Sequence, residues 1–215
     1  MGSPKGKLTA LQTETLDALV RRAPDFFLTG GAVLVGWTLK HRITDDLDLF
    51  TTSDDAMAGA AAAVRGAATE VHAIVTPMTT TPDFHRYVLT RGEETVRVDF
   101  VRDRTPMLTP KQVVDGIRMD TPEEIVANKI AAVVGRSEVR DLVDLLALER
   151  LGLRVEDHME NARKKDAGVS PATLAWLLSS LHAPDRVDGA TPEQLEAFIR
   201  DLERRMLALS PPNEK

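Results

Sequence analysis

Residues 28–50 read LTGGAVLVGWTLKHRITDDLDLF, with a pair of glycines opening an apolar run and an acidic D-x-D motif closing it. Gly30 and Gly31 follow a short apolar stretch typical of a strand, and the residues after them favour a helix, so we expect strand, glycine turn and helix in that order. In the D-x-D motif, leucines alternate with Asp46 and Asp48, as in a half-buried strand. Both carboxylates should therefore share one face of that strand.

A third aspartate occupies a similar place in a later segment. The residues from Glu70 to Arg102 predict β-strands, the last two joined as a hairpin, and Asp99 lies in the middle of the final strand. Arg97 is expected on the same face. Three carboxylates on neighbouring strands would repel one another in a folded core, so the cluster needs a cation. Hard oxygen ligands suit Mg²⁺ or Mn²⁺, particularly where substrate phosphates complete the coordination.

The glycine pair fits the same interpretation. Backbone N–H groups at a glycine-rich turn that opens a helix form a site for phosphate oxygens. Gly30-Gly31 is neither a G-x-G-x-x-G fingerprint nor a P-loop, so taken alone it also fits a plain tight turn. An isolated D-D-x-D is more often a solvated turn, but its alternation with leucines and the later Asp99 favour the metal interpretation. Lys40, His41 and Arg42, just before the D-x-D, could contact a triphosphate or an RNA backbone, although the pattern favours an exposed loop at least as much.

Composition narrows the class of protein. A chain of 215 residues is expected to form one integrated unit, either a single core or a core with a helical extension, and two independent domains are the less favoured alternative. The net charge of −6 argues against a generally basic nucleic-acid coat, and the lack of cysteine excludes disulfides and thiolate zinc sites. The N-terminal sequence has no apolar region of a signal peptide, and no apolar run is long enough to span a membrane, so we expect a cytoplasmic protein without a membrane partner.

The fold class expected is α+β, with a small mixed β-sheet flanked by helices and an α-helical C-terminal part. Pro106 and Pro110 interrupt the strand pattern, which places the division between residues 1–105, carrying the aspartates, and residues 106–215, which are mostly helical. Ser137 is expected to cap the second helix of the C-terminal part.

A resemblance joins these features. The glycine pair, the D-x-D, the later VRVDFV and the segment NKIAAVVGRSEVRDLVDLLAL together resemble the nucleotidyltransferases of the AbiEii/AbiGii toxin type, within the DNA polymerase β-like superfamily. The match covers roughly residues 26–150. It implies a polymerase β-like nucleotidyltransferase core, with the helical C-terminal part completing the nucleotide cleft.

The resemblance also implies a reaction. A nucleoside monophosphate would pass from an NTP to an acceptor, with pyrophosphate leaving. Asp46 and Asp48 would hold the metals, Mg²⁺ or Mn²⁺, and Asp99 would help to hold them and accept the proton of the attacking hydroxyl.

The later motif contributes further candidates. By the resemblance, Lys129 steadies the triphosphate, Asp141 matches an acidic position needed for activity, and Asp144 is a weaker candidate beside it. Lys129 could instead be surface charge, and Arg140 with Asp141 could form a structural ion pair. Arg136 and Arg140 are cations that could bind phosphate.

Members of this family act as toxins that block translation, some by adding nucleotides to tRNA, and they come with a cognate antitoxin. We therefore expect an RNA acceptor, with tRNA leading, and an antitoxin protein as partner. Two alternatives stay open: transfer of the nucleotide to a small molecule or a protein side chain, and a non-catalytic member that binds an NTP or a partner.

Overall fold

The computed structural model describes residues 6–210. Its helices and strands are, in chain order, α1 (Ala10–Arg22), β1 (Phe27–Thr29), α2 (Gly30–Val33), the π-helical turn η1 (Leu34–Thr38), β2 (Asp46–Thr51), α3 (Asp54–Glu70), β3 (Ile74–Thr80), β4 (Phe84–Arg91), β5 (Glu94–Arg102), β6 (Gln112–Val114), β7 (Ile117–Met119), α4 (Pro122–Arg136), α5 (Val139–Glu149), α6 (Val155–Lys165), α7 (Pro171–Ser180) and α8 (Pro192–Leu209). The expected α+β class is confirmed.

The chain divides into two compact units, here called the sheet unit and the helical unit. Of the described residues, the sheet unit holds those up to Arg104 together with Pro110–Thr121, and the helical unit holds Thr105–Thr109 together with those from Pro122 onward. The chain therefore leaves the sheet unit, returns to it and leaves again. A division at residues 105 and 106 had been expected, and the structure differs from it because Pro110–Thr121 pairs with the sheet.

The sheet unit is built on one mixed sheet of seven strands, in the order β3-β4-β5-β2-β1-β7-β6. The central pair β2 and β5 is parallel, as is the pair β1 and β7, and the other neighbouring strands are antiparallel. The D-x-D strand thus lies between the strand that carries Asp99 and the strand that leads into the glycine turn. This central position places the sequence motifs side by side.

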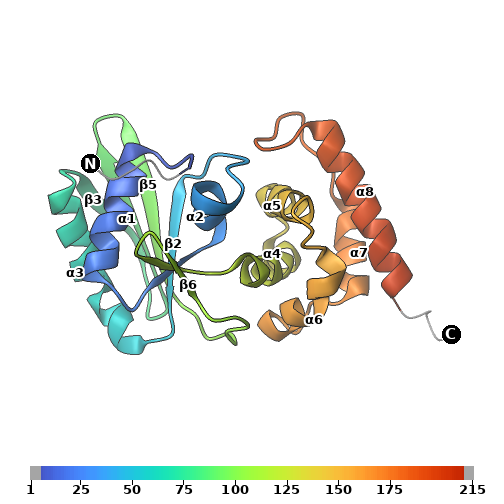
Figure 1. Ribbon diagram of the computed structural model, residues 1–215, viewed down its shortest axis with the longest axis horizontal. Coiled ribbons are helices and arrows are strands. Elements are labelled where there is room, and N and C mark those ends of the chain that lie inside the picture. The colour runs from blue at the N-terminus through green and yellow to red at the C-terminus, as the bar shows by residue number, and fades with distance from the viewer. Residues whose placement is uncertain (1–5, 211–215) are drawn as a thin grey trace. The chain divides into compact units, whose positions relative to one another are not determined.

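Helices cover both faces of the sheet (Figure 1): α1 and α3 pack on one face, and α2 lies on the other. The leucines of β2, Leu47 and Leu49, are buried, whereas Asp46 and Asp48 alternate with them. Ser53 is the N-cap of α3, and its hydroxyl accepts a hydrogen bond from the Ala56 N–H, as is typical of an N-cap serine. The leucine face of β2 is therefore buried in the core, and the aspartates lie on the opposite face, on which α2 also lies.

The hairpin of β6 and β7 was not among the elements predicted. Its strands have only three residues each, too few to show a periodic pattern. Asp115 and Gly116 form its turn with φ angles of 52° and 77°. An Asp-Gly pair is the preferred sequence for such a two-residue turn, so a signal was present.

The helical unit consists of five helices within the described residues, α4 to α8. Helix α4 begins with Pro122 at its first position and two acids in its first turn, where proline and negative charge are both favoured. The expectation that Ser137 caps α5 is wrong: Ser137 has a left-handed φ of 53°, its hydroxyl donates to the Val133 carbonyl, and Glu138 is the N-cap residue. Among residues 6–210, none of the helices is long and apolar enough to cross a membrane.

Candidate nucleotidyltransferase site

The glycine turn directly adjoins the D-x-D strand. Gly30 has a φ of +65°, in the left-handed region that side chains disfavour, and a Cβ added there would lie 2.6 Å from Oδ2 of Asp48. Thr29, the residue before it, is the register partner of Asp48 across β1 and β2. Glycine is thus required at residue 30 both by the backbone and by the carboxylate beside it.

Gly31 makes space for a different side chain. A Cβ at this position would lie 2.7 Å from Nη2 of Arg42 and 3.2 Å from Oγ1 of Thr44. Arg42 is buried, so the exposed loop considered from the sequence is wrong at this residue, and its Nη1 donates to the Ile43 carbonyl at 2.8 Å. The glycine pair therefore has one neighbour of each charge, Asp48 beside Gly30 and Arg42 beside Gly31.

The three aspartates lie on adjacent parallel strands. In the register of β2 and β5, Asp48 is directly opposite Asp99, and Asp46 is opposite Arg97. Asp46 and Asp99 are buried. The structure therefore brings the two distant motifs onto one face of the sheet, as the sequence analysis expected.

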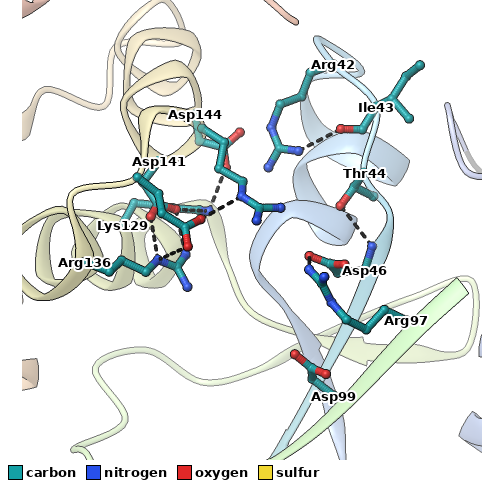
Figure 2. Close-up of polar contacts among 12 residues, drawn as sticks. Arg42, Ile43, Thr44, Asp46, Arg97, Asp99, Lys129, Arg136, Asp141 and Asp144 are labelled. Atoms are coloured by element: carbon teal, nitrogen blue, oxygen red, sulfur yellow. Dashed lines mark hydrogen bonds and ion pairs between the residues drawn. The ribbon is translucent and has the colours of Figure 1, made fainter. Parts of the chain in front are cut away.

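Two arginines supply positive charge to these carboxylates. Arg86, the register partner of Asp99 across β4 and β5, donates to it through Nε at 2.8 Å and Nη2 at 2.6 Å. Arg97 on β5 donates through Nη2 to Oδ2 of Asp46 on β2, and Figure 2 shows this pair together with Asp99, which is also on β5. The hydrogen bonds and charge of Asp99, with smaller contributions from Asp46 and Asp48, raise the pKa of Arg86 against the opposing effect of burial. The pKa of Arg86 therefore depends on all three carboxylates.

The donor set fits a hard divalent cation by its chemistry, because it consists of carboxylate oxygens on adjacent strands beside a glycine with no Cβ. Within residues 6–210, however, no three acidic, histidine or cysteine side chains are arranged to hold one ion. The contacts above give a physical reason: guanidinium groups already bind oxygens of Asp46 and Asp99.

The helical unit contains a buried charge cluster of its own (Figure 2). The ammonium of Lys129 on α4 lies 2.7 Å from an oxygen of Asp141 and 2.7 Å from an oxygen of Asp144, both on α5. Burial would lower the pKa of Lys129, but the charges of Asp144 and Asp141 outweigh it and the pKa is raised. Burial likewise raises the pKa of Asp141, and the charge of Lys129 with the hydrogen bonds of Arg136 and Lys129 lowers it overall. Lys129 and Asp141 are therefore both charged at neutral pH.

The two arginines proposed for phosphate are more exposed. Arg136 donates to both oxygens of Asp141, at 2.9 and 3.0 Å, while 52% of its side chain is exposed. Arg140 is 44% exposed and donates to Glu138 at 2.8 Å. Lys129 is only 8% exposed, so the interpretation of this lysine as surface charge is wrong.

The comparisons with known proteins agree with this arrangement. Residues 15–211 match the model of the nucleotidyl transferase AbiEii toxin family of type IV toxin–antitoxin systems. The chain belongs to the AbiEii family. This membership confirms the resemblance seen in the sequence and implies a nucleotide substrate and an antitoxin partner. A search of curated proteins gave no match.

Two solved structures from H. pylori are similar to this chain. One, provisionally assigned as a nucleotidyltransferase, aligns with a TM-score of 0.53 at 16% identity, over 94% of this chain and 95% of that chain. Another, JHP933, aligns with a TM-score of 0.48 at 16% identity, over 93% and 91% of the two chains. At 16% identity, the similarity to the first of these structures is evidence for the fold of this AbiEii family member.

The structure thus places the predicted residues in two groups. The sheet unit holds Gly30, Gly31 and the three aspartates, and the helical unit holds Lys129, Arg136, Arg140 and Asp141. Sequence reasoning gave no role to Arg86 or Arg97. The predicted hairpin of β4 and β5 carried a signal for Arg86. Its two-residue turn makes Arg91 the partner of Glu94, and the same antiparallel register makes Arg86 the partner of Asp99.

Proposed function

We propose that this AbiEii family member is a metal-dependent enzyme that transfers a nucleoside monophosphate from an NTP to an RNA acceptor, with tRNA the leading candidate. In the cell it would act as a toxin restrained by a cognate antitoxin protein. The observation that carries the proposal is the pairing of Asp48 with Asp99 in adjacent parallel strands, with Gly30 against Asp48.

The chemistry follows from the groups on this face. Asp46, Asp48 and Asp99 would hold Mg²⁺ or Mn²⁺, which when bound polarises the phosphate and lowers the pKa of the attacking hydroxyl. The hydroxyl oxygen of the acceptor forms a bond to the α-phosphorus, the bond from that phosphorus to the β-phosphate oxygen breaks, and pyrophosphate leaves. Asp99 accepts the hydroxyl proton. The N–H groups of Gly30 and Gly31 bind phosphate oxygens.

The helical unit has its own candidates for phosphate binding. Arg136 and Arg140 have exposed guanidinium groups suited to bidentate contact with phosphate. Lys129 is committed to Asp141 and Asp144 in the free protein, and contact with a phosphate requires it to share its ammonium with the substrate. Asp141 would then act by positioning Lys129 and Arg136.

The experiment is incubation of the purified protein with total cell RNA, Mg²⁺ and each labelled NTP in turn. We expect label in RNA, lost on chelation of the metal and lost in Asp48→Asn. Asp45→Asn is the matched control, because Asp45 is the exposed neighbour of the motif and should leave incorporation unchanged. Parallel reactions with protein and aminoglycoside acceptors test the alternatives. Nucleotide binding without label in any acceptor would contradict the proposed transfer and favour a non-catalytic member.

A further inference from the structure

The cations on the acidic cluster belong to the protein itself. Arg86 uses two nitrogen atoms to bind both oxygens of Asp99, and Arg97 binds Oδ2 of Asp46. The carboxylate side chains are 7% and 12% exposed, whereas the side chains of Arg86 and Arg97 are 37% and 32% exposed. The acids are thus held in the sheet, and the guanidinium groups can move toward solvent.

The register makes these pairs specific to this face. Arg97 is directly opposite Asp46, and Arg86 is directly opposite Asp99, so each arginine lies beside its acid without a change in the backbone. Asp48 pairs across the strands with Asp99, an acid, and would meet repulsion without the nearby cations. The two arginines therefore neutralise a cluster of like charges that the strands force together.

A divalent cation needs the same oxygens. A carboxylate oxygen that accepts a charge-assisted hydrogen bond is a poorer ligand for a metal, and a guanidinium next to the ion repels it. The guanidinium groups and a metal ion therefore compete for the same oxygens of Asp46 and Asp99.

We propose that Arg86 and Arg97 hold the acidic cluster together in the metal-free protein, and that a divalent cation binds there only by displacing both guanidinium groups. This inference rests on the proposed function, because it concerns the metal of that reaction. The two arginines then set how tightly the metal binds.

The direct test is titration of the purified protein with Mn²⁺ alone, reading free Mn²⁺ by electron paramagnetic resonance. Arg86→Gln and Arg97→Gln are each expected to bind Mn²⁺ about tenfold more tightly than the unaltered protein, because the ion no longer has to displace a charge-assisted hydrogen bond, and the double variant more tightly still. Asp48→Asn added to the double variant should abolish the gain. Unchanged or weaker Mn²⁺ binding in the arginine variants would overturn the proposal.

Arg104→Gln is the matched control. Arg104 forms the same two-nitrogen contact with Asp83, at 3.2 and 2.6 Å, on the exposed surface of the sheet unit. Its loss should leave Mn²⁺ affinity unchanged. An equal gain in this variant would mean that any removed positive charge strengthens binding, and would contradict displacement.

Thermal unfolding provides a second measurement, since loss of either arginine leaves buried carboxylates repelling one another. The arginine variants should melt below the unaltered protein in chelator and gain more from added Mn²⁺, because a ligand that binds the folded state stabilises it by mass action. Failure to fold even with saturating Mn²⁺ would also overturn the proposal, since the ion should take the place of the guanidinium groups.

The outcomes separate this inference from the proposed function. Labelled RNA from the unaltered protein, with no gain of Mn²⁺ affinity in the arginine variants, refutes displacement and leaves nucleotide transfer standing. Tighter Mn²⁺ binding that depends on Asp48, with no labelled RNA, supports displacement and refutes the transfer.

Discussion

Gly30 and Asp48 approach so closely that a Cβ atom at residue 30 would lie 2.6 Å from Oδ2 of the aspartate. The two residues come from different motifs: Gly30 opens α2 directly after β1, and Asp48 lies in β2. Their contact explains why the glycine pair and the D-x-D motif belong to one site. Any side chain at residue 30 would push the carboxylate away from its place opposite Asp99.

We therefore predict that Gly30→Ala strongly reduces nucleotide transfer. The change adds a Cβ in the left-handed region of φ and displaces a carboxylate of the site, and displacements of this size cost about 100-fold in rate. Gly59→Ala is the control, because Gly59 lies in α3 with nothing within 4 Å of an added Cβ. The rate of nucleotide transfer is measured with labelled NTP and RNA. A Gly30→Ala variant as active as Gly59→Ala would show that transfer does not depend on the close approach of Gly30 to Asp48.

A second prediction concerns the charge cluster of the helical unit. Lys129→Met should lower the free energy of unfolding by about 3 to 5 kcal/mol, because it leaves Asp141 and Asp144 buried without their shared ammonium. Urea unfolding followed by circular dichroism measures this change. Arg140→Met removes an exposed pair and should cost less than about 1 kcal/mol.

The stability of Lys129→Met also tests the division of roles. A loss below about 1 kcal/mol would show that the cluster contributes little to folding and that the lysine is kept for the substrate alone. A large loss means that activity measurements on this variant need the conservative Lys129→Arg beside them. Arginine keeps the charge but presents a planar fork in place of a single ammonium.

Local patterns were sufficient to predict the central motifs. The alternation of leucine with Asp46 and Asp48 fixed both the strand and its charged face, because a strand has a period of two residues. The glycine pair predicted the start of a helix, and α2 begins at Gly30. These elements depend on neighbours in the sequence, which is why sequence alone was adequate.

Contacts between distant segments were harder to predict. Arg97 was expected on the face of Asp99, but its pairing with Asp46 depends on the register of two strands about 50 residues apart, which no local pattern specifies. The capping prediction failed at Ser137 because serine also donates to a carbonyl four residues back, which competes with capping. The roles of the site residues stay predictions.

A third prediction concerns the hairpin of β6 and β7, which holds the strand before the glycine turn. Asp120 accepts hydrogen bonds from Thr29 and from the ammonium of Lys111, and all three side chains are buried. Asp120→Ala should lower the free energy of unfolding by about 3 kcal/mol or more, since the charge of Lys111 then lacks its buried partner.

The double variant Asp120→Ala with Lys111→Met is the control for this prediction. Removing both charges leaves no unpaired buried ion, so chemical denaturation should show that it recovers a large part of the stability lost by Asp120→Ala. A double variant less stable than Asp120→Ala would mean that the ammonium is held mainly by other contacts, including its position 4.2 Å over the ring of Phe27.

The last prediction is a dependence of stability on pH in the helical unit. Arg205 on α8 binds Glu149 at 2.9 Å and also binds Glu156 on α6. Burial alone would raise the pKa of Glu156, but hydrogen bonds from Arg205 and Arg154 lower it from 4.5 to about 2. Because the folded pKa of Glu156 lies below the unfolded one, the ion pair contributes its full stability above pH 4.5, and that contribution is lost as the pH falls toward 2.

Glu156→Gln should therefore lower the free energy of unfolding by about 1 to 2 kcal/mol at pH 7, with a smaller difference from the unaltered protein at pH 3. Urea unfolding of both proteins at the two pH values measures the change, with Glu160→Gln on the exposed side of α6 as the control. A cost for Glu156→Gln that does not shrink between pH 7 and pH 3 would show that its carboxylate charge is not what ties α6 to α8.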